Sequence, residues 1–170
     1  EGILFSFIKL ATILEKFELI PFESLINQGV NSVMIGHLLF PKIDSIYPAT
    51  LSKRVVTDLL RIKFKYDGLV VSDALIMNAI SNKYSSAISA VLAFEAGIDL
   101  IMMPKDIDEA IDALTDAFYS EKISLERLNI SRERRKKQLD LIRNEHDLEN
   151  HELMHEDIKS NFCRDAYRFS

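Results

Sequence analysis

One aspartate in this sequence stands where an ionisable group is well placed for chemistry. Asp73 follows the apolar run Leu69–Val71, which is typical of a short strand covered on both faces. In folds that alternate strands and helices, sites lie beyond the carboxyl ends of parallel strands. Asp73 is therefore the first candidate for carboxylate chemistry. The alternative is that Asp73 only caps a helix that begins near Leu75, because Asp is a favoured N-cap.

Two further strand ends carry candidate residues. His37 follows the strand-like run Ser32–Ile35 and could orient a substrate hydroxyl, although such a histidine more often bonds a backbone carbonyl. Met77 lies four residues after Asp73 and so on the same side of a helix, where core packing is the alternative role. The pair Met103-Pro104 ends a third strand.

The segment from His151 to His155 reads His-Glu-Leu-Met-His. Two histidines four residues apart on a helix can hold zinc, with Glu152 as general base. A third ligand would have to come from the short tail that follows, and the predicted helix is polar all round rather than part of a walled cleft. The pattern is therefore interpreted as a coincidence, and no metal or cofactor is expected.

Charge and composition exclude several classes of protein. The chain has 170 residues, is 48% apolar and carries a net charge of −5, so neither a membrane-spanning run nor a nucleic-acid surface is expected. The basic run 132–137 is interpreted as a solvated helix face rather than a nucleic-acid patch. A single cysteine, Cys163, fits a reducing compartment, and the cytoplasm is predicted.

The elements that must position these residues alternate along the chain. Strands are expected near residues 32, 69 and 98, separated by helices, which predicts parallel βα units. Three parallel strands alone would leave open edges, so they indicate part of a larger α/β domain, most plausibly a (β/α)₈ barrel of about 250 residues. The expected helices cover residues 18–28, 52–63, 75–80, 85–96, 106–119 and 131–143.

Several ordered motifs resemble one known family. They lie in the segments Leu19–Phe22, Val33–His37, Pro48–Ser52, Tyr66–Ile80 and Ala96–Pro104. Together they resemble glycoside hydrolase family 3, nearest to its β-N-acetylhexosaminidase branch. The resemblance implies that residues 18–143 form the C-terminal part of a TIM-type barrel with about three βα units. Residues 1–17 stay unassigned, and residues 144–170 read as a linker helix or the start of a second domain.

The resemblance also implies an activity. It makes Asp73 the nucleophile of a retaining hydrolase that removes terminal β-linked N-acetylglucosamine from muropeptides or chitin-type oligosaccharides. A retaining enzyme needs its acid/base partner about 5 Å from the nucleophile. His37 and Met77 are the predicted substrate contacts, and neither nucleic acid nor a membrane is an expected partner.

One part of the family pattern is missing. In the hexosaminidase branch the acid/base is a histidine paired with an aspartate on an upstream loop, and residues 1–17 contain neither residue type. The chain by itself is therefore expected to be inactive or nearly so. Two alternatives stay open: a non-catalytic remnant or half-barrel that assembles with another chain, and a zinc hydrolase built on His151 and His155.

Overall fold

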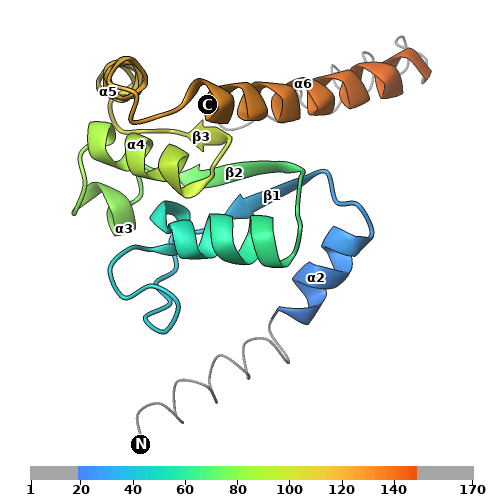
Figure 1. Cartoon of the computed structure of the whole chain (residues 1–170), viewed down its shortest axis with the longest axis horizontal. Coiled ribbons are helices and arrows are strands. Elements are labelled where there is room, and N and C mark those ends of the chain that lie inside the picture. The colour runs from blue at the N-terminus through green and yellow to red at the C-terminus, as the bar shows by residue number, and fades with distance from the viewer. Residues whose placement is uncertain (1–18, 149–170) are drawn as a thin grey trace, which may run out of the picture. The chain divides into compact units, whose positions relative to one another are not determined.

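The structure is a computed structural model that describes residues 19–148 (Figure 1). Its centre is a three-stranded parallel sheet in the order β1-β2-β3. The strands are β1 (Ser32–Ile35), β2 (Leu69–Ala74) and β3 (Leu100–Met102). The predicted alternation of parallel strands and helices is confirmed, and β2, which carries Asp73, is the central strand.

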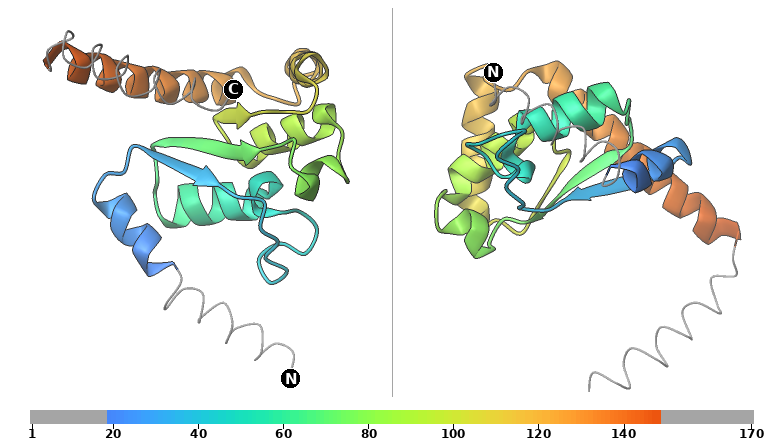
Figure 2. Two further views of the ribbon diagram at one scale, coloured as in Figure 1. Left: turned by 180° about the vertical axis from the view of Figure 1, so that it is seen from behind. Right: turned by 90° about the horizontal axis from the view of Figure 1, so that it is seen from below.

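Helices lie against one face of this sheet (Figures 1 and 2). These are η3 (Arg54–Lys63) and α4 (Ser86–Ala96), and α5 (Ile107–Tyr119) packs against α4. The chain also forms α2 (Ile20–Asn27) and α6 (Leu125–Leu148). The core packs Val70 and Ile98 against Val56 and Leu60 of η3. On the two outer strands, the residues that alternate with the half-buried ones are exposed: Met34 of β1 by 66%, and Leu100 and Met102 of β3 by 37% and 39%. The described chain thus covers one face of the sheet, not both.

Local signals set most helix ends as predicted. Ser85 accepts a hydrogen bond from Ile88 N–H, and Asp106 accepts one from Glu109 N–H, so each caps the helix that follows. Gly97 ends α4 with φ +118°, a left-handed conformation that glycine adopts without penalty. These caps fix where α4 begins and ends and where α5 begins. They therefore limit the segment between the two helices that can form β3.

Three helices differ from expectation. The short helix α3 covers Asn78–Ser81 and its N-cap is Met77, so Asp73 does not cap a helix. The helix expected over residues 52–63 is present, and the Ser52 hydroxyl accepts a hydrogen bond from Val55 N–H near its start, but it is a π-helix over Arg54–Lys63 and its N-cap is Lys53. The last helix, expected over residues 131–143, is α6, which is longer and covers Leu125–Leu148.

The chain divides into two compact units, Glu1–Arg135 and Lys136–Ser170. The sheet and every site described below lie in the first unit. Within residues 19–148, no helix combines the length and the apolar character needed to cross a membrane.

Candidate active site at the carboxyl ends of the strands

Asp73 is the penultimate residue of β2 and is half-buried. One carboxylate oxygen, Oδ1, accepts a hydrogen bond from Ala74 N–H at 2.7 Å. No ion pair to Asp73 forms among residues 19–148. The β2–β3 register is irregular between Val71 and Ala74, which is common beside functional sites. The carboxylate is thus oriented but not neutralised by a cation.

The chain beyond Asp73 is tied to the end of β3. Leu75 N–H donates to Met102 O at 3.0 Å, and Ile76 N–H donates to Met103 O at 2.9 Å. Met103 has φ +43°, which is uncommon for a non-glycine residue and is found mostly where the surrounding structure fixes it. The strand ends of β2 and β3 are therefore joined directly beside the candidate carboxylate.

His37 reaches across from β1 to the residue after Asp73. Its Nε2 lies 2.9 Å from Ala74 O, and its Nδ1 lies 2.9 Å from Thr50 Oγ1. Thr50 is fully buried in the short helix η2 (Ala49–Leu51), and its hydroxyl is within 2.9 Å of the Ile35 carbonyl. Both ring nitrogens of His37 are therefore within hydrogen-bond distance of protein atoms. This agrees with the alternative from the sequence, in which the histidine bonds a backbone carbonyl.

Met77 follows Asp73 but points outward. Its side chain is 47% exposed, so the alternative that it packs in the core is wrong. Its backbone N–H donates to Ala74 O at 3.0 Å. Ala74 is thus the common acceptor for His37 and Met77.

A buried aspartate orders the loop that carries Thr50. The Asp44 carboxylate accepts the Ser52 hydroxyl at 2.7 Å and the backbone N–H groups of Ile46 and Tyr47. Burial raises the pKa of Asp44, but these hydrogen bonds outweigh burial and hold the pKa below its ordinary value. The loop between β1 and η3 therefore has a fixed conformation with Thr50 facing His37.

Thr50 and Ala74 are site residues that reasoning from the sequence missed, whereas Met103 was singled out there as a strand end but without a specific role. Thr50 lies in one of the motifs that carry the family resemblance, and that motif was its only signal. Ala74 and Met103 contribute backbone groups, which carry no signature in residue type. Their roles depend on where strand ends meet in space.

No metal site supports a different chemistry in the described chain. Among residues 19–148, no group of three or more His, Cys, Asp or Glu side chains is arranged to hold a metal ion. The His151–His155 pattern lies outside the described residues.

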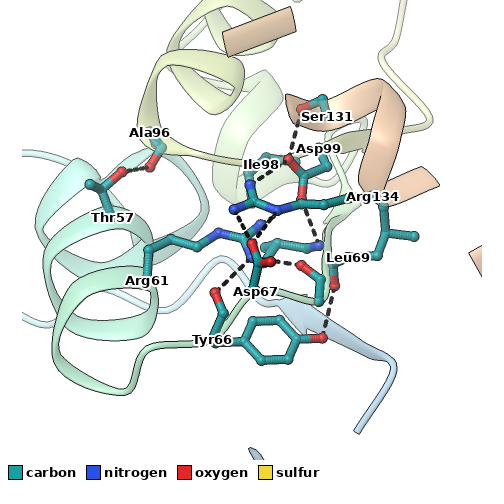
Figure 3. A network of polar contacts seen from close by, with 12 residues as sticks. Thr57, Arg61, Tyr66, Asp67, Leu69, Ala96, Ile98, Asp99, Ser131 and Arg134 are labelled. Carbon is teal, nitrogen blue, oxygen red and sulfur yellow. Dashed lines mark hydrogen bonds and ion pairs between the residues drawn. The ribbon is translucent and has the colours of Figure 1, made fainter. Parts of the chain in front are cut away.

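A second charged cluster lies at the opposite, amino-terminal ends of the strands. Asp99, immediately before β3, has a fully buried side chain. Its carboxylate oxygens lie 2.5 Å from Arg61 Nη2, 3.1 Å from Arg127 Nη1 and 3.4 Å from Arg134 Nη1. Figure 3 shows Arg61 and Arg134 converging on this carboxylate from different elements. We call Asp99 and its three arginines the arginine cluster.

Further polar contacts complete the arginine cluster. Ser131 Oγ donates to Asp99 at 2.7 Å, and Val70 N–H donates to the same carboxylate at 3.0 Å. Burial lowers the pKa of Arg61 and of Arg127, while the charge of Asp99 opposes that shift. Arg134 also bonds Asp67 at 2.7 Å, so the interpretation of the basic run as a wholly solvated face is wrong for this residue.

The fold and the site together define a class: a parallel βα protein with an accessible carboxylate at the end of its central strand. The profile of the "Glycosyl hydrolase family 3 N terminal domain" matches residues 10–137. The chain therefore belongs to glycosyl hydrolase family 3, whose barrel fold is compatible with the sheet and helices observed. The predicted family, and with it the glycoside hydrolase class, is confirmed.

Three relatives show where in the family the chain lies. A β-N-acetylglucosaminidase structure from Paenibacillus sp. str. FPU-7 is 45% identical at TM-score 0.70, covering 72% of this chain and 24% of that one. The β-N-acetylglucosaminidase of Thermotoga maritima is 31% identical at TM-score 0.70, covering 76% and 29%. A β-hexosaminidase of Chromobacterium violaceum is 36% identical, covering 59% and 29%. The chain thus spans less than a third of the length of these relatives.

Proposed function

We propose that this chain supplies the nucleophile of a retaining β-N-acetylhexosaminidase, and that Asp73 is that nucleophile. The observation that carries the proposal is the position of Asp73. It lies at the carboxyl end of the central strand, half-buried, held by one backbone N–H and paired with no cation among residues 19–148. A nucleophile must be ionised, fixed in place and accessible, and this arrangement meets the geometric requirements.

The reaction begins with attack by the Asp73 carboxylate on the anomeric carbon of a terminal N-acetylglucosamine. The bond from that carbon to the leaving oxygen breaks, and its electron pair departs with the leaving group. Water then cleaves the glycosyl-enzyme ester and restores the carboxylate, with overall retention. The proposed substrates are muropeptides or chitin-type oligosaccharides, and the proposed compartment is the cytoplasm.

The proposed domain organisation follows from the same assignment. Residues 18–143 form about three βα units from the C-terminal part of a (β/α)₈ barrel, and residues 144–170 lead out of it. Support comes from the relatives, which match this chain over less than a third of their length. A general acid/base is worth about 10²–10⁴ in rate, so we expect little turnover of ordinary substrates by this chain alone.

Covalent labelling tests the nucleophile without requiring the acid/base. A dinitrophenyl β-N-acetylglucosaminide carries a leaving group that departs without a proton, so attack by Asp73 should still form the ester. Intact-protein mass spectrometry should then show a gain of one N-acetylhexosaminyl group, located on the peptide containing Asp73. Asp73→Asn should show no gain, and Asp108→Asn, which changes an exposed carboxylate on α5, should label like the unchanged chain.

Two results would count against the proposal. A chain that gains no mass at saturating glycoside would show that Asp73 is not a competent nucleophile here. Equal labelling of Asp73→Asn would place the nucleophile elsewhere. Rapid steady turnover that Asp73→Asn abolishes would confirm the nucleophile and overturn the expectation of low activity.

A second candidate is assembly with another copy of the chain. An apolar groove between α2, β1 and η3 is lined by Phe22, Met34, Leu38, Leu59 and Phe64, among other residues. Met34 and Leu38 are 66% and 65% exposed, more than expected for large apolar side chains beside one another. Size-exclusion chromatography with light scattering would show a dimer or higher assembly, whereas a stable monomer would eliminate this candidate.

A further inference from the structure

We propose that His37 is a positioning residue for Asp73 and that it acts through the backbone of Ala74 rather than by contact with the sugar. This inference rests on the proposed function of Asp73. It is carried by the two hydrogen bonds of the imidazole, which link the end of β1 to the residue that orients the carboxylate.

The hydrogen-bond roles at Nε2 follow from the chemistry of the partner. The Ala74 carbonyl can only accept, so His37 Nε2 must carry a proton and donate it. In the neutral ring, Nδ1 then accepts from the Thr50 hydroxyl. In the charged ring, Nδ1–H donates to the Thr50 oxygen, and the Thr50 hydroxyl donates its own hydrogen bond to the carbonyl of Ile35 or Gly36. The bond to Ala74 is the same in both states.

The imidazole extends the contact between two strands beyond the end of their ladder. The β1–β2 register ends at the pair Ile35–Ser72, one residue before Asp73. His37 then bonds Ala74, so the ring joins the strands on the far side of Asp73. Its own anchor, Thr50, is fully buried and fixed to the backbone of β1. The two strands are therefore joined on both sides of Asp73, by the Ile35–Ser72 pair before it and by the His37–Ala74 hydrogen bond after it.

Because Ala74 is hydrogen-bonded to both His37 and Asp73, restraining Ala74 also restrains the Asp73 carboxylate. Its N–H donates to Asp73 Oδ1 at 2.7 Å, and its carbonyl accepts from His37 and from Met77 N–H. Without the imidazole, the Ala74 carbonyl would accept one hydrogen bond, from Met77 N–H, instead of two. The backbone of Ala74 would then be more mobile, and so would the Asp73 carboxylate that the Ala74 N–H orients.

Amide hydrogen exchange of the full chain, followed by NMR, tests the restraint without any sugar. In His37→Ala the amide of Ala74 should exchange about two- to tenfold faster, the range that one hydrogen bond supports. His37→Gln places an amide donor near the former Nε2 and should restore slow exchange, whereas His37→Asn places its donor near the former Nδ1 and should not. Val56→Ala, a core truncation in η3, controls for general loss of stability and should leave Ala74 unchanged relative to its neighbours.

The ring itself gives a spectroscopic readout. The ¹⁵N signal of His37 Nε2 should have the shift of a protonated nitrogen at pH 8. An unprotonated Nε2, or exchange at Ala74 that does not respond to His37→Ala, would overturn the proposal.

Labelling with the dinitrophenyl glycoside separates positioning from sugar contact. A positioning role predicts that His37→Ala lowers the labelling rate at saturation about ten- to a hundredfold, because small misplacements of a reacting group are costly. The half-saturating concentration should stay within about twofold. The opposite pattern, an unchanged maximal rate with weaker saturation, would identify a sugar contact and overturn the proposal. If the unchanged chain does not label at all, the proposed function of Asp73 fails, while the exchange experiment still decides whether His37 restrains Ala74.

Discussion

Asp73 lies near the carboxyl end of β2 and Asp99 immediately before the start of the adjacent strand β3, and their surroundings differ sharply. Asp99 is fully buried and contacts three arginines and a serine hydroxyl. Asp73 is half-buried and accepts one backbone hydrogen bond, with no cation beside it among residues 19–148. The same side chain therefore has two environments, one that neutralises its charge and one that leaves the charge available.

This difference separates a structural carboxylate from the one that we propose to be reactive. A buried carboxylate is tolerated only when cations and hydrogen bonds compensate the loss of water, and the arginine cluster provides both. The cluster joins η3, β3 and the first part of α6, so it fixes elements that are distant in sequence. A nucleophile cannot be saturated in this way, because its oxygen must reach an electrophile. Asp73 is instead oriented by the N–H of Ala74, whose carbonyl lies 2.9 Å from His37 Nε2.

The largest expected effect follows from removing the charge of Asp99. Asp99→Asn leaves three buried or half-buried arginines without their shared carboxylate. Breaking a buried ion pair from one side costs about 3–5 kcal/mol, so the free energy of unfolding should fall by that amount. Urea unfolding followed by circular dichroism would measure it. A loss below about 1 kcal/mol would mean that the arginine cluster is not a stabilising centre.

A smaller effect is expected at Tyr66, whose hydroxyl donates to Leu69 O at 3.2 Å beside the arginine cluster. Tyr66→Phe should lower the free energy of unfolding by about 0.5–1.5 kcal/mol at pH 8. Burial raises the pKa of Tyr66 from 10.0 to about 12. Because the folded pKa lies above the unfolded one, this contribution is complete below pH 10 and is lost as pH rises through 12.

Thermal unfolding between pH 8 and pH 12 would check whether the contribution of Tyr66 to stability falls as pH rises. The difference in stability between the unchanged chain and Tyr66→Phe should narrow as pH rises through this range. Tyr119→Phe is the matched control, because that ring is 79% exposed and outside the arginine cluster. A difference in stability that widens as pH rises would show that the burial of Tyr66 does not oppose its ionisation.

The smallest effect on stability is expected at Asp73 itself. Asp73→Asn removes a charge that no cation compensates and keeps an acceptor for Ala74 N–H, so the free energy of unfolding should change by less than about 0.5 kcal/mol. The same urea titration used for Asp99→Asn measures it. A loss as large as that of Asp99→Asn would erase the contrast between the two carboxylates and argue that Asp73 is structural.

Much of the local structure could be predicted because it depends on neighbouring residues. The strand Ser32–Ile35 and the caps Ser85, Asp106 and Gly97 follow from short-range patterns. Asp73 was found by the same reasoning, since an acidic residue after an apolar run is visible in the sequence. Its assignment as a nucleophile, which stays a prediction, came from the family resemblance.

Short-range reasoning failed where packing partners decided the outcome. A helix was expected over residues 106–119, and α5 covers Ile107–Tyr119 with Asp106 as its N-cap. Its apolar residues Ile107 and Ile111 are nevertheless 62% and 55% exposed, while Ala110 and Ala117 are buried. The closely packed neighbour is the small-residue helix α4, against which alanines fit better than isoleucines. Which side of a helix is buried is a property of the pair of helices, not of one.

The sequence by itself determined the order of elements, the position of Asp73 at a strand end and the family. Only the tertiary structure decided what surrounds each carboxylate. Asp99 meets Arg61, Arg127 and Arg134 through contacts 28 to 38 residues apart, and His37 meets Ala74 across 37 residues. No spacing rule covers such distances, because they are set when parallel strands pair and helices close over one face. The reactivity of a carboxylate depends on those neighbours, and so it is fixed only when the chain folds.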